Sequence, residues 1–192
     1  MVKVIVGIKT SNLNNVIKKA LQENGYTIVD NVFDLSECIR KVRTLKPQLL
    51  IVEYGFSSGS LIEMIEVINS DKICPVIVLA NESQKSQMES VIFENDIFNI
   101  FLYKPFNKAS FISYIDLIIK NYNKMRKLEL EIEKLKDSLE TRKIVEKAKG
   151  ILMKELKIDE NTAMKKLQKL SMDSKLPLKE IALKILSMNF KK

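Results

Sequence analysis

The chain has 192 residues, of which 46% are hydrophobic and 29% charged, a composition typical of a globular protein with enough apolar material for a core. It contains no histidine and only two cysteines, which excludes histidine-based catalysis and a histidine phosphorelay and argues against a tetrahedral zinc site. No apolar run approaches the roughly 20 residues of a membrane-spanning helix and no signal peptide is evident, so we expect a cytoplasmic, non-enzymatic protein without metal or cofactor.

The net charge of +8 is concentrated near the C-terminal end. Residues 1–123 carry 13 basic and 13 acidic side chains, and residues 124–141 carry 5 of each. Residues 142–192 carry 14 basic and 6 acidic side chains, which accounts for the whole excess. A neutral part followed by a basic part suggests a control domain joined to a module that binds a polyanion. From the charge alone, a lysine-rich surface without such a function is an equally good interpretation.

The N-terminal part alternates between two sequence patterns. Short apolar runs predict strands at residues 2–8, 26–29, 49–54, 75–80 and 97–103, and helical spacing predicts helices at residues 12–24, 35–45, 61–69 and 85–94, with a fifth from Lys108 onward. Near-continuous apolar strands that alternate with helices indicate a parallel sheet covered on both faces, which is a doubly wound (βα)5 fold of the α/β class. In such folds ligands bind at the carboxyl ends of the strands.

The helix from Lys108 is predicted to continue well beyond the sheet. Between about residues 107 and 156 there is no proline, and the only glycine is Gly150. Apolar side chains step through this segment by three or four residues and form a heptad seam: Met125, Leu128, Ile132, Leu135 and Leu139. Such a seam is typical of a coiled coil. We therefore expect a stalk that joins two copies in a homodimer, with a helix packed on its own domain as the alternative.

Three amphipathic helices are predicted from residue 140 onward. The first covers residues 140–155, Asp159 can cap the second, and Pro177 is well placed as the first residue of the third. None of these helices would be stable alone at this length, so we expect them to form an all-α bundle. The predicted organisation is a domain at residues 1–120, a coiled-coil linker at 121–140 and the bundle at 141–192.

The last 55 or so residues resemble the ANTAR family, the output module of amide-responsive, nitrate-responsive and related bacterial antiterminators. The resemblance lies in the segments RKIVEKAKGILM at 142–153, DENTAM at 159–164 and LKEIA at 178–182. Met164 departs from the family, which usually has an aromatic residue there. The resemblance implies a module that binds paired short stem-loops in a transcript leader, so that the terminator hairpin does not form and polymerase reads through.

The basic side chains of this segment are the candidate RNA ligands. They are Arg142, Lys143, Lys147, Lys149, Lys154, Lys165, Lys166 and Lys169. Lys143, Lys147 and Lys154 share one helical stripe with Gly150, and lysines can anchor phosphates. A glycine permits close approach of another backbone, but we assign Gly150 to packing between helices. A solvated lysine face is the alternative interpretation of the stripe.

The first 120 or so residues resemble a receiver domain, the response-regulator part of a two-component system, in degenerate form. A working receiver needs an acidic pair after the first strand to hold Mg²⁺, an aspartate after the third, a hydroxyl after the fourth and a lysine after the fifth. The corresponding positions hold Gly7 and Ile8, Glu53, Ala80 and Lys104, so only the lysine remains. We expect a pseudo-receiver that is not phosphorylated. Glu53 is expected to pair with Lys104, either as a mimic of a phosphorylated aspartate or as a structural remnant.

Together these patterns predict a dimeric RNA-binding transcription antiterminator controlled by its receiver-like domain. Its expected partners are RNA leader stem-loops, a second copy of the chain and a sensor or ligand-binding protein. The first alternative is a DNA-binding response regulator, because three basic helices can form a helix-turn-helix. The second is a protein-interaction scaffold whose basic face binds an acidic protein.

Overall fold

The computed structural model describes residues 1–85 and 99–189, and the chain divides into two compact units, Met1–Arg126 and Lys127–Lys192. The described part of the first unit contains a five-stranded parallel sheet in the order β2-β1-β3-β4-β5. Its strands are β1 (Val2–Gly7), β2 (Tyr26–Asn31), β3 (Leu49–Glu53), β4 (Val76–Asn81) and β5 (Asn99–Lys104). This order, which reverses direction at β1, confirms the predicted doubly wound α/β class.

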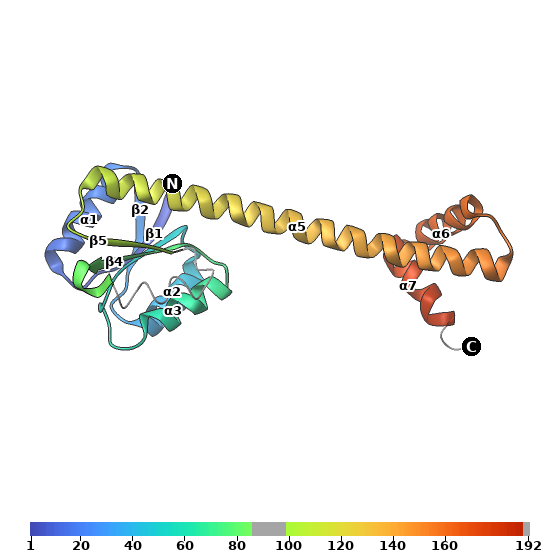
Figure 1. Cartoon of the computed structure of the whole chain (residues 1–192), viewed down its shortest axis with the longest axis horizontal. Helices are drawn as coiled ribbons and strands as arrows, with labels where there is room; N and C mark the ends of the chain where they lie inside the picture. Colours follow the sequence, from blue (N-terminus) through green and yellow to red (C-terminus); the bar gives the residue numbers. More distant parts are fainter. Residues whose placement is uncertain (86–98, 190–192) are drawn as a thin grey trace. The chain divides into compact units, whose positions relative to one another are not determined.

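Helices cover both faces of the sheet (Figure 1). On one face, α1 (Ser11–Glu23) and the first turns of α5 (Lys108–Leu156) share a buried cluster with β1 and β3. On the other, α2 (Leu35–Leu45) and α3 (Leu61–Ser70) share a second cluster with the same strands. All five residues of β3 are buried, which is why the strand is apolar up to its last residue, Glu53, instead of alternating.

Local sequence signals set where the helices begin. The Asp34 carboxylate accepts hydrogen bonds from the backbone N–H groups of Ser36 and Glu37, at 2.8 and 3.1 Å, and so caps α2. The predicted bounds agree with the structure to within two residues, and β2 extends furthest beyond its predicted end. The helix predicted at residues 85–94 lies, apart from Lys85, outside the described residues.

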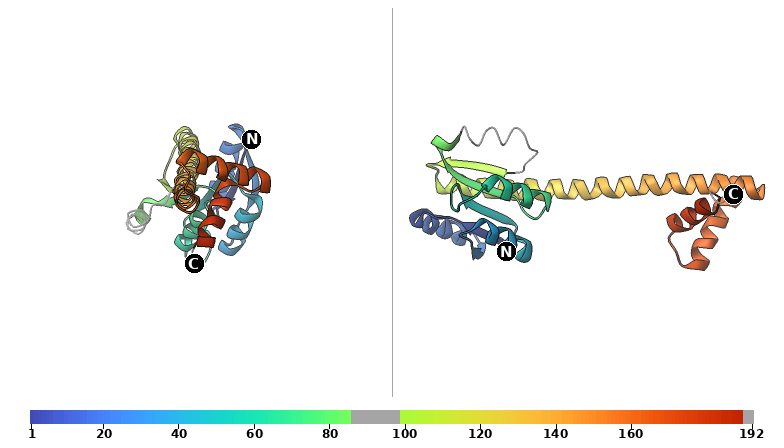
Figure 2. Two further views of the ribbon diagram at one scale, coloured as in Figure 1. Left: turned by 90° about the vertical axis from the view of Figure 1, so that its right-hand side faces the viewer. Right: turned by 90° about the horizontal axis from the view of Figure 1, so that it is seen from below.

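The second unit consists of the C-terminal part of α5 together with α6 (Glu160–Ser174) and α7 (Leu178–Asn189) (Figure 2). Its core is the buried cluster Val145, Ala148, Leu167, Ile181 and Ala182. Ala148, Ala163 and Ala182 are completely buried, and their small side chains allow the helices to approach closely. The described part of the ANTAR-like segment thus consists of helices joined by short turns at residues 157–159 and 175–177, as predicted.

The boundaries of α6 and α7 test two predictions. The Asp159 carboxylate accepts from the Thr162 backbone N–H at 3.0 Å and from its hydroxyl at 2.6 Å, which confirms the predicted cap of α6. Pro177 lies one residue before α7 instead of being its first residue. Its carbonyl accepts from the Ile181 N–H at 3.2 Å, so the proline, which has no N–H to donate, stands where the helix needs only an acceptor.

Within residues 1–85 and 99–189, none of the helices combines the length and the apolar character that crossing a bilayer requires.

Candidate functional site

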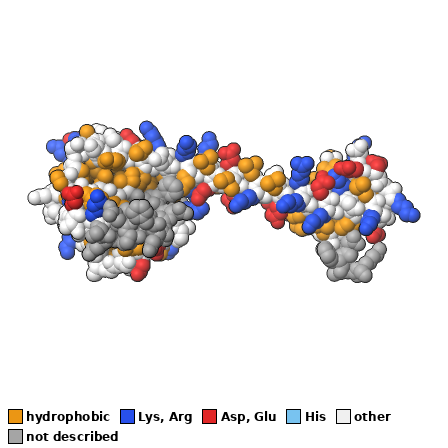
Figure 3. Space-filling view, viewed as in Figure 1, with side chains coloured by type: hydrophobic (Ala, Val, Ile, Leu, Met, Phe, Trp, Pro, Cys, Tyr) orange, Lys and Arg blue, Asp and Glu red, His pale blue; other side chains and the backbone are white. Residues whose placement is uncertain are grey.

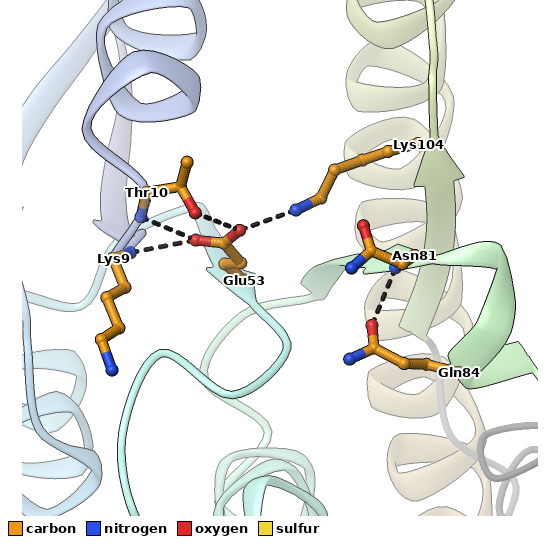
Figure 4. Close-up of polar contacts among 6 residues, drawn as sticks. All are labelled: Lys9, Thr10, Glu53, Asn81, Gln84 and Lys104. Carbon is orange, nitrogen blue, oxygen red and sulfur yellow. Dashed lines mark hydrogen bonds and ion pairs between the residues drawn. The ribbon is translucent and has the colours of Figure 1, made fainter.

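The carboxyl ends of β1, β3 and β5 bring together the residues where a receiver would carry its chemistry (Figure 4). Glu53 ends β3, Lys104 ends β5, and Lys9 and Thr10 lie in the loop between β1 and α1. Ile8 and Ala80 are buried at 2% and 1% exposure, and neither side chain can hold a metal or form a hydrogen bond. The edge of the sheet is therefore dominated by one carboxylate and its donors.

Gly7 shows why an acidic residue would not fit after β1. A Cβ atom added there would stand 3.1 Å from side-chain atoms of Phe56, Val32 and Val52, which is tighter than ordinary van der Waals contact. A carboxylate at this position would displace the apolar packing around it. Apolar side chains thus fill the space beside Gly7, where the sequence led us to expect the counterpart of an acidic residue.

Glu53 is 6% exposed, and its two oxygens accept four hydrogen bonds. Oε1 accepts from Lys104 Nζ at 2.6 Å and from the Thr10 hydroxyl at 2.8 Å. Oε2 accepts from the backbone N–H groups of Thr10 and Lys9, at 2.9 and 3.1 Å. The pairing with Lys104 that the sequence led us to expect is therefore present. The carboxylate also holds the loop that leads into α1.

These donors determine the protonation of Glu53. Burial is the strongest single influence and acts to raise its pKa, but the Lys104 ammonium and the Thr10 donors together outweigh it, so the pKa lies below its usual value. Glu53 is therefore an anion at neutral pH, and Lys104 neutralises it. Among the described residues, no group of three or more His, Cys, Asp or Glu side chains could hold a metal ion.

The end of β4 does not take part in this network. Ala80 has no polar side-chain atom, and the Asn81 backbone N–H donates to Gln84 Oε1 at 2.8 Å. Asn81 and Gln84 form a capping box for the short 3-10 helix Glu82–Gln84. Within the described residues, the hydrogen bonds of Glu53 thus link β3 to β5 and to the loop after β1, but not to β4.

In the second unit, seven of the eight predicted RNA ligands lie at the surface. They are Arg142, Lys143, Lys147 and Lys154 on α5, and Lys165, Lys166 and Lys169 on α6. Figure 3 shows basic side chains distributed over this unit, with acidic ones among them. An open hollow of about 440 Å³ on α5 is lined by Arg142, Lys143 and Lys147 together with Leu139 and Glu146.

Lys149 is the exception, and its assignment as a surface ligand is corrected. The residue is only 8% exposed. Its ammonium forms ion pairs with Glu146 at 2.6 Å and with Glu160 at 2.7 Å. The pKa of Lys149 is raised, first by Glu146 and then by Glu160. A phosphate would have to displace these carboxylates to reach it.

Gly150 is also corrected, because nothing in the bundle requires a glycine there. The residue is exposed, and a Cβ added to it would meet none of the described atoms within 4 Å. An exposed glycine inside a helix is less favourable than alanine by about 1 kcal/mol. Packing between helices therefore does not explain it. Met164 is different, since it packs against the core cluster of the second unit and so fills space where the family usually has a ring.

The apolar seam of α5 is exposed. Leu128, Ile132, Leu135 and Leu139 have exposures of 49%, 52%, 60% and 60%, and Met125, which belongs to the first unit, is partly buried. Figure 3 shows hydrophobic side chains at the surface of this part of α5, between charged side chains of both signs. Nothing in the described chain covers the seam, which disfavours the alternative of a helix packed on its own domain.

Sequence reasoning missed the partners of these residues. Thr10, Glu146 and Glu160 were not predicted to matter, and Lys179 pairs with Asp137 at 2.6 Å. Glu146 was accessible to sequence analysis, because it lies three residues before Lys149 on one helix face. Thr10 and Glu160 were not, because each meets its partner only through the fold.

The ANTAR domain family matches residues 133–186 of the chain. The chain is also similar to the transcriptional regulatory protein PdtaR of Mycobacterium tuberculosis, with 31% identity over 166 residues. That alignment covers 86% of this chain and 80% of the relative. The likeness therefore extends through both units and is not confined to the basic bundle.

Solved structures resemble the first unit. The signal receiver domain of a modulated diguanylate cyclase from Desulfovibrio desulfuricans has a TM-score of 0.52 at 17% identity, covering 64% of this chain and 97% of that domain. The receiver domain of a Francisella response regulator has a TM-score of 0.52 at 22% identity, covering 63% of this chain and 98% of that domain. At these identities the likeness shows the fold alone.

Proposed function

Because the chain belongs to the ANTAR family of transcription regulators, with a receiver-like domain ahead of its ANTAR domain, we propose that it binds RNA stem-loops and acts as a transcription antiterminator. The observation that carries the proposal is the exposed set of basic side chains on α5 and α6. This set belongs to the segment that holds the whole net charge of +8. Phosphate groups attract such side chains, and release of the counterions of RNA favours the complex.

Gly150 supports contact with RNA along α5. It stands on the stripe of Lys143, Lys147 and Lys154, one turn beyond Lys147 and one turn before Lys154. Without a Cβ, the helix surface at this point can come closer to a sugar-phosphate backbone than any other residue would allow. The cost of an exposed glycine in a helix is then offset by binding.

The geometry of α7 disfavours the DNA-binding alternative. A recognition helix presents several polar or basic side chains to the major groove. Between Leu178 and Asn189, the only basic residues are Lys179 and Lys184, and Lys179 is paired with Asp137 and Glu140. The exposed apolar side chains of α7 include Leu183 and Met188, which are poorly suited to reading base edges by hydrogen bonds.

We also propose that the receiver-like domain is not phosphorylated. Mg²⁺ requires carboxylate oxygens beside the phosphate, and Gly7 is enclosed by apolar side chains. Glu53 and Lys104 already neutralise each other. Control of the regulator is therefore proposed to come from a sensor or ligand-binding protein, or from the abundance of the chain.

The second partner in the proposal is another copy of the chain. Leu128, Ile132, Leu135 and Leu139 are about half exposed on one face of α5. Covering a half-exposed leucine stabilises a complex by about 1–1.5 kcal/mol, and a heptad seam covers it best with an identical seam. A homodimer would also carry two ANTAR domains, which suits paired stem-loops.

The first prediction concerns the lysines of α5. Replacing Lys143 and Lys147 with alanine lowers the affinity for a stem-loop RNA, and it reduces the slope of log K against log salt by about 1.5 if each contacts one phosphate. The fold is retained because both side chains are exposed. Binding is measured by fluorescence anisotropy over a series of salt concentrations.

The matched control is the double change of Lys18 and Lys19 to alanine in α1, which leaves the slope unaltered. A hairpin is also compared with its fully paired RNA counterpart and with duplex DNA, because unpaired loop bases offer edges that a duplex hides. Equal affinity for all three, with no preference for the loop sequence, would contradict antitermination.

The second prediction separates stability from binding at Gly150. Gly150→Ala stabilises the second unit by about 1 kcal/mol, because alanine favours the helix, yet it lowers the affinity for stem-loop RNA. Thermal unfolding followed by circular dichroism measures the first effect, and anisotropy the second. Ser138→Ala, at another exposed position of α5, is the control, with unchanged RNA affinity. A Gly150→Ala variant that binds RNA as tightly as the wild type refutes the close approach.

The third prediction concerns phosphoryl transfer. Incubation with acetyl phosphate or phosphoramidate and Mg²⁺ leaves the mass of the chain unchanged, because no acidic pair is available to bind the metal beside Glu53. Intact-mass spectrometry checks this result, with a complete receiver domain phosphorylated in parallel. A base-labile phosphoryl adduct that maps to residues 1–126 contradicts the prediction.

The fourth prediction concerns the seam. Changing Leu128 and Leu135 to aspartate gives a monomer whose first unit remains folded, since repulsion between carboxylates replaces the apolar contact. Light scattering measures the mass, and circular dichroism the fold. Leu130→Asp is the matched control: Leu130 is 50% exposed but lies off the seam, so this variant stays dimeric. Dimers in the double variant would place the interface elsewhere.

A further inference from the structure

Lys149 differs in its surroundings from the other basic residues of the ANTAR domain. It is 8% exposed, while the seven other predicted ligands are exposed. Its ammonium lies between two carboxylates from different helices. Glu146 precedes it by three residues on α5 at 2.6 Å, and Glu160 is the first residue of α6 at 2.7 Å.

The charge of Lys149 ties the two helices together. The Lys149 side chain is nearly covered, whereas the carboxylates of Glu146 and Glu160 are more than half exposed. A covered ammonium is costly unless it is paired, so Lys149 favours the conformation in which both carboxylates reach it. Ala148, its neighbour in α5, is completely buried, as is Ala163 in α6. Small side chains therefore lie on the covered faces of both helices, within three residues of the ion pair. Asp159, which caps α6, directly precedes Glu160, so the pair acts at the first turn of that helix.

The helices joined in this way carry the exposed lysines. Lys143, Lys147 and Lys154 stand on α5, and Lys165, Lys166 and Lys169 stand on α6. A single stem-loop can engage both sets only if the angle between the helices is held. Packing of apolar ridges into grooves allows several crossing angles, and apolar contacts by themselves have no preferred direction. An ion pair with two partners adds that direction.

We propose that Lys149 is a positioning residue, which fixes α6 on α5 through Glu146 and Glu160 so that the lysines of both helices reach one RNA stem-loop together. The proposal rests on the RNA-binding function proposed above. It differs from the expectation that Lys149 itself contacts a phosphate.

Glu160 could be a mere surface carboxylate or a residue that holds Lys149, and these two roles predict opposite effects of its replacement on RNA affinity. If Glu160 is merely a surface carboxylate near a bound polyanion, Glu160→Gln removes a repulsion and strengthens RNA binding. If it holds Lys149, the same change weakens binding by about fivefold or more, a factor typical of coupling between distant groups. Asp173→Asn, on α6 near its C-terminal end, is the control: it removes one negative charge without affecting the Lys149 pair and does not weaken binding.

The salt dependence distinguishes positioning from contact at Lys149. Lys149→Met weakens binding at every salt concentration by the same factor and leaves the slope of log K against log salt unchanged. Lys147→Met reduces that slope by about 0.7–0.9, because an exposed lysine that contacts a phosphate releases a counterion. Lys149→Arg, which keeps the charge and can bind both carboxylates, retains most of the affinity.

The experiment uses the full chain and a stem-loop RNA, at a temperature well below the unfolding midpoint of each variant, which circular dichroism provides. Under these conditions a purely stabilising ion pair leaves the affinity unchanged. If Lys149→Met does not fold, the RNA affinities of Glu160→Gln and Lys149→Arg decide whether Lys149 is a positioning residue. Three outcomes would overturn the positioning role but not the proposed function. They are tighter RNA binding by Glu160→Gln, unaltered RNA affinity in that variant, or a reduced salt slope in Lys149→Met. A wild-type chain that binds no stem-loop overturns the proposed function as well.

Discussion

A single helix contributes to both hydrophobic cores, and the other elements of the protein depend on it. The first turns of α5 place Phe111 and Ile115 in the core of the receiver-like domain, and its last turns place Val145 and Ala148 in the core of the ANTAR domain. Neither core is complete without it. Between them, residues 131–140 of α5 are exposed throughout. The helix therefore has three kinds of surface, one for each core and, between them, an apolar seam that nothing in the described chain covers.

Internal ion pairs determine which charges remain for a partner. Lys104 is taken up by Glu53, Lys149 by Glu146 and Glu160, and Lys179 by Asp137 and Glu140. In each case the lysine joins elements or turns that apolar packing alone would orient less strictly. On α5 and α6 of the ANTAR domain, the predicted RNA ligands other than Lys149 lie at the surface. Pairing therefore separates lysines that hold the fold from lysines suited to bind phosphate.

The same principle distinguishes the receiver-like domain from a signalling receiver. A site that binds Mg²⁺ and phosphate must offer carboxylate oxygens to the metal. Here the Glu53 oxygens accept four hydrogen bonds within the chain, and apolar side chains surround Gly7. Whether Glu53 reproduces a phosphorylated state or is a remnant, its contacts connect the loop after β1 with β5 and need no ligand to do so.

The sequence by itself determined the fold class, the Asp159 cap and most helix bounds to within one or two residues, because each depends on periodicity or on neighbours within one turn. The family followed from the resemblance of the segments at 142–153, 159–164 and 178–182. It also indicated the Glu53–Lys104 pair, since parallel strands end at a common edge. Only the tertiary structure decided that Lys149 is buried and that Gly150 has open space beside it. Lys149 and Lys147 are both lysines of one helix, and what separates them is the approach of α6, which begins at Glu160 after a turn. Burial and ion pairing across this turn depend on how α5 and α6 pack. No local pattern in the chain encodes the distance between Lys149 and Glu160.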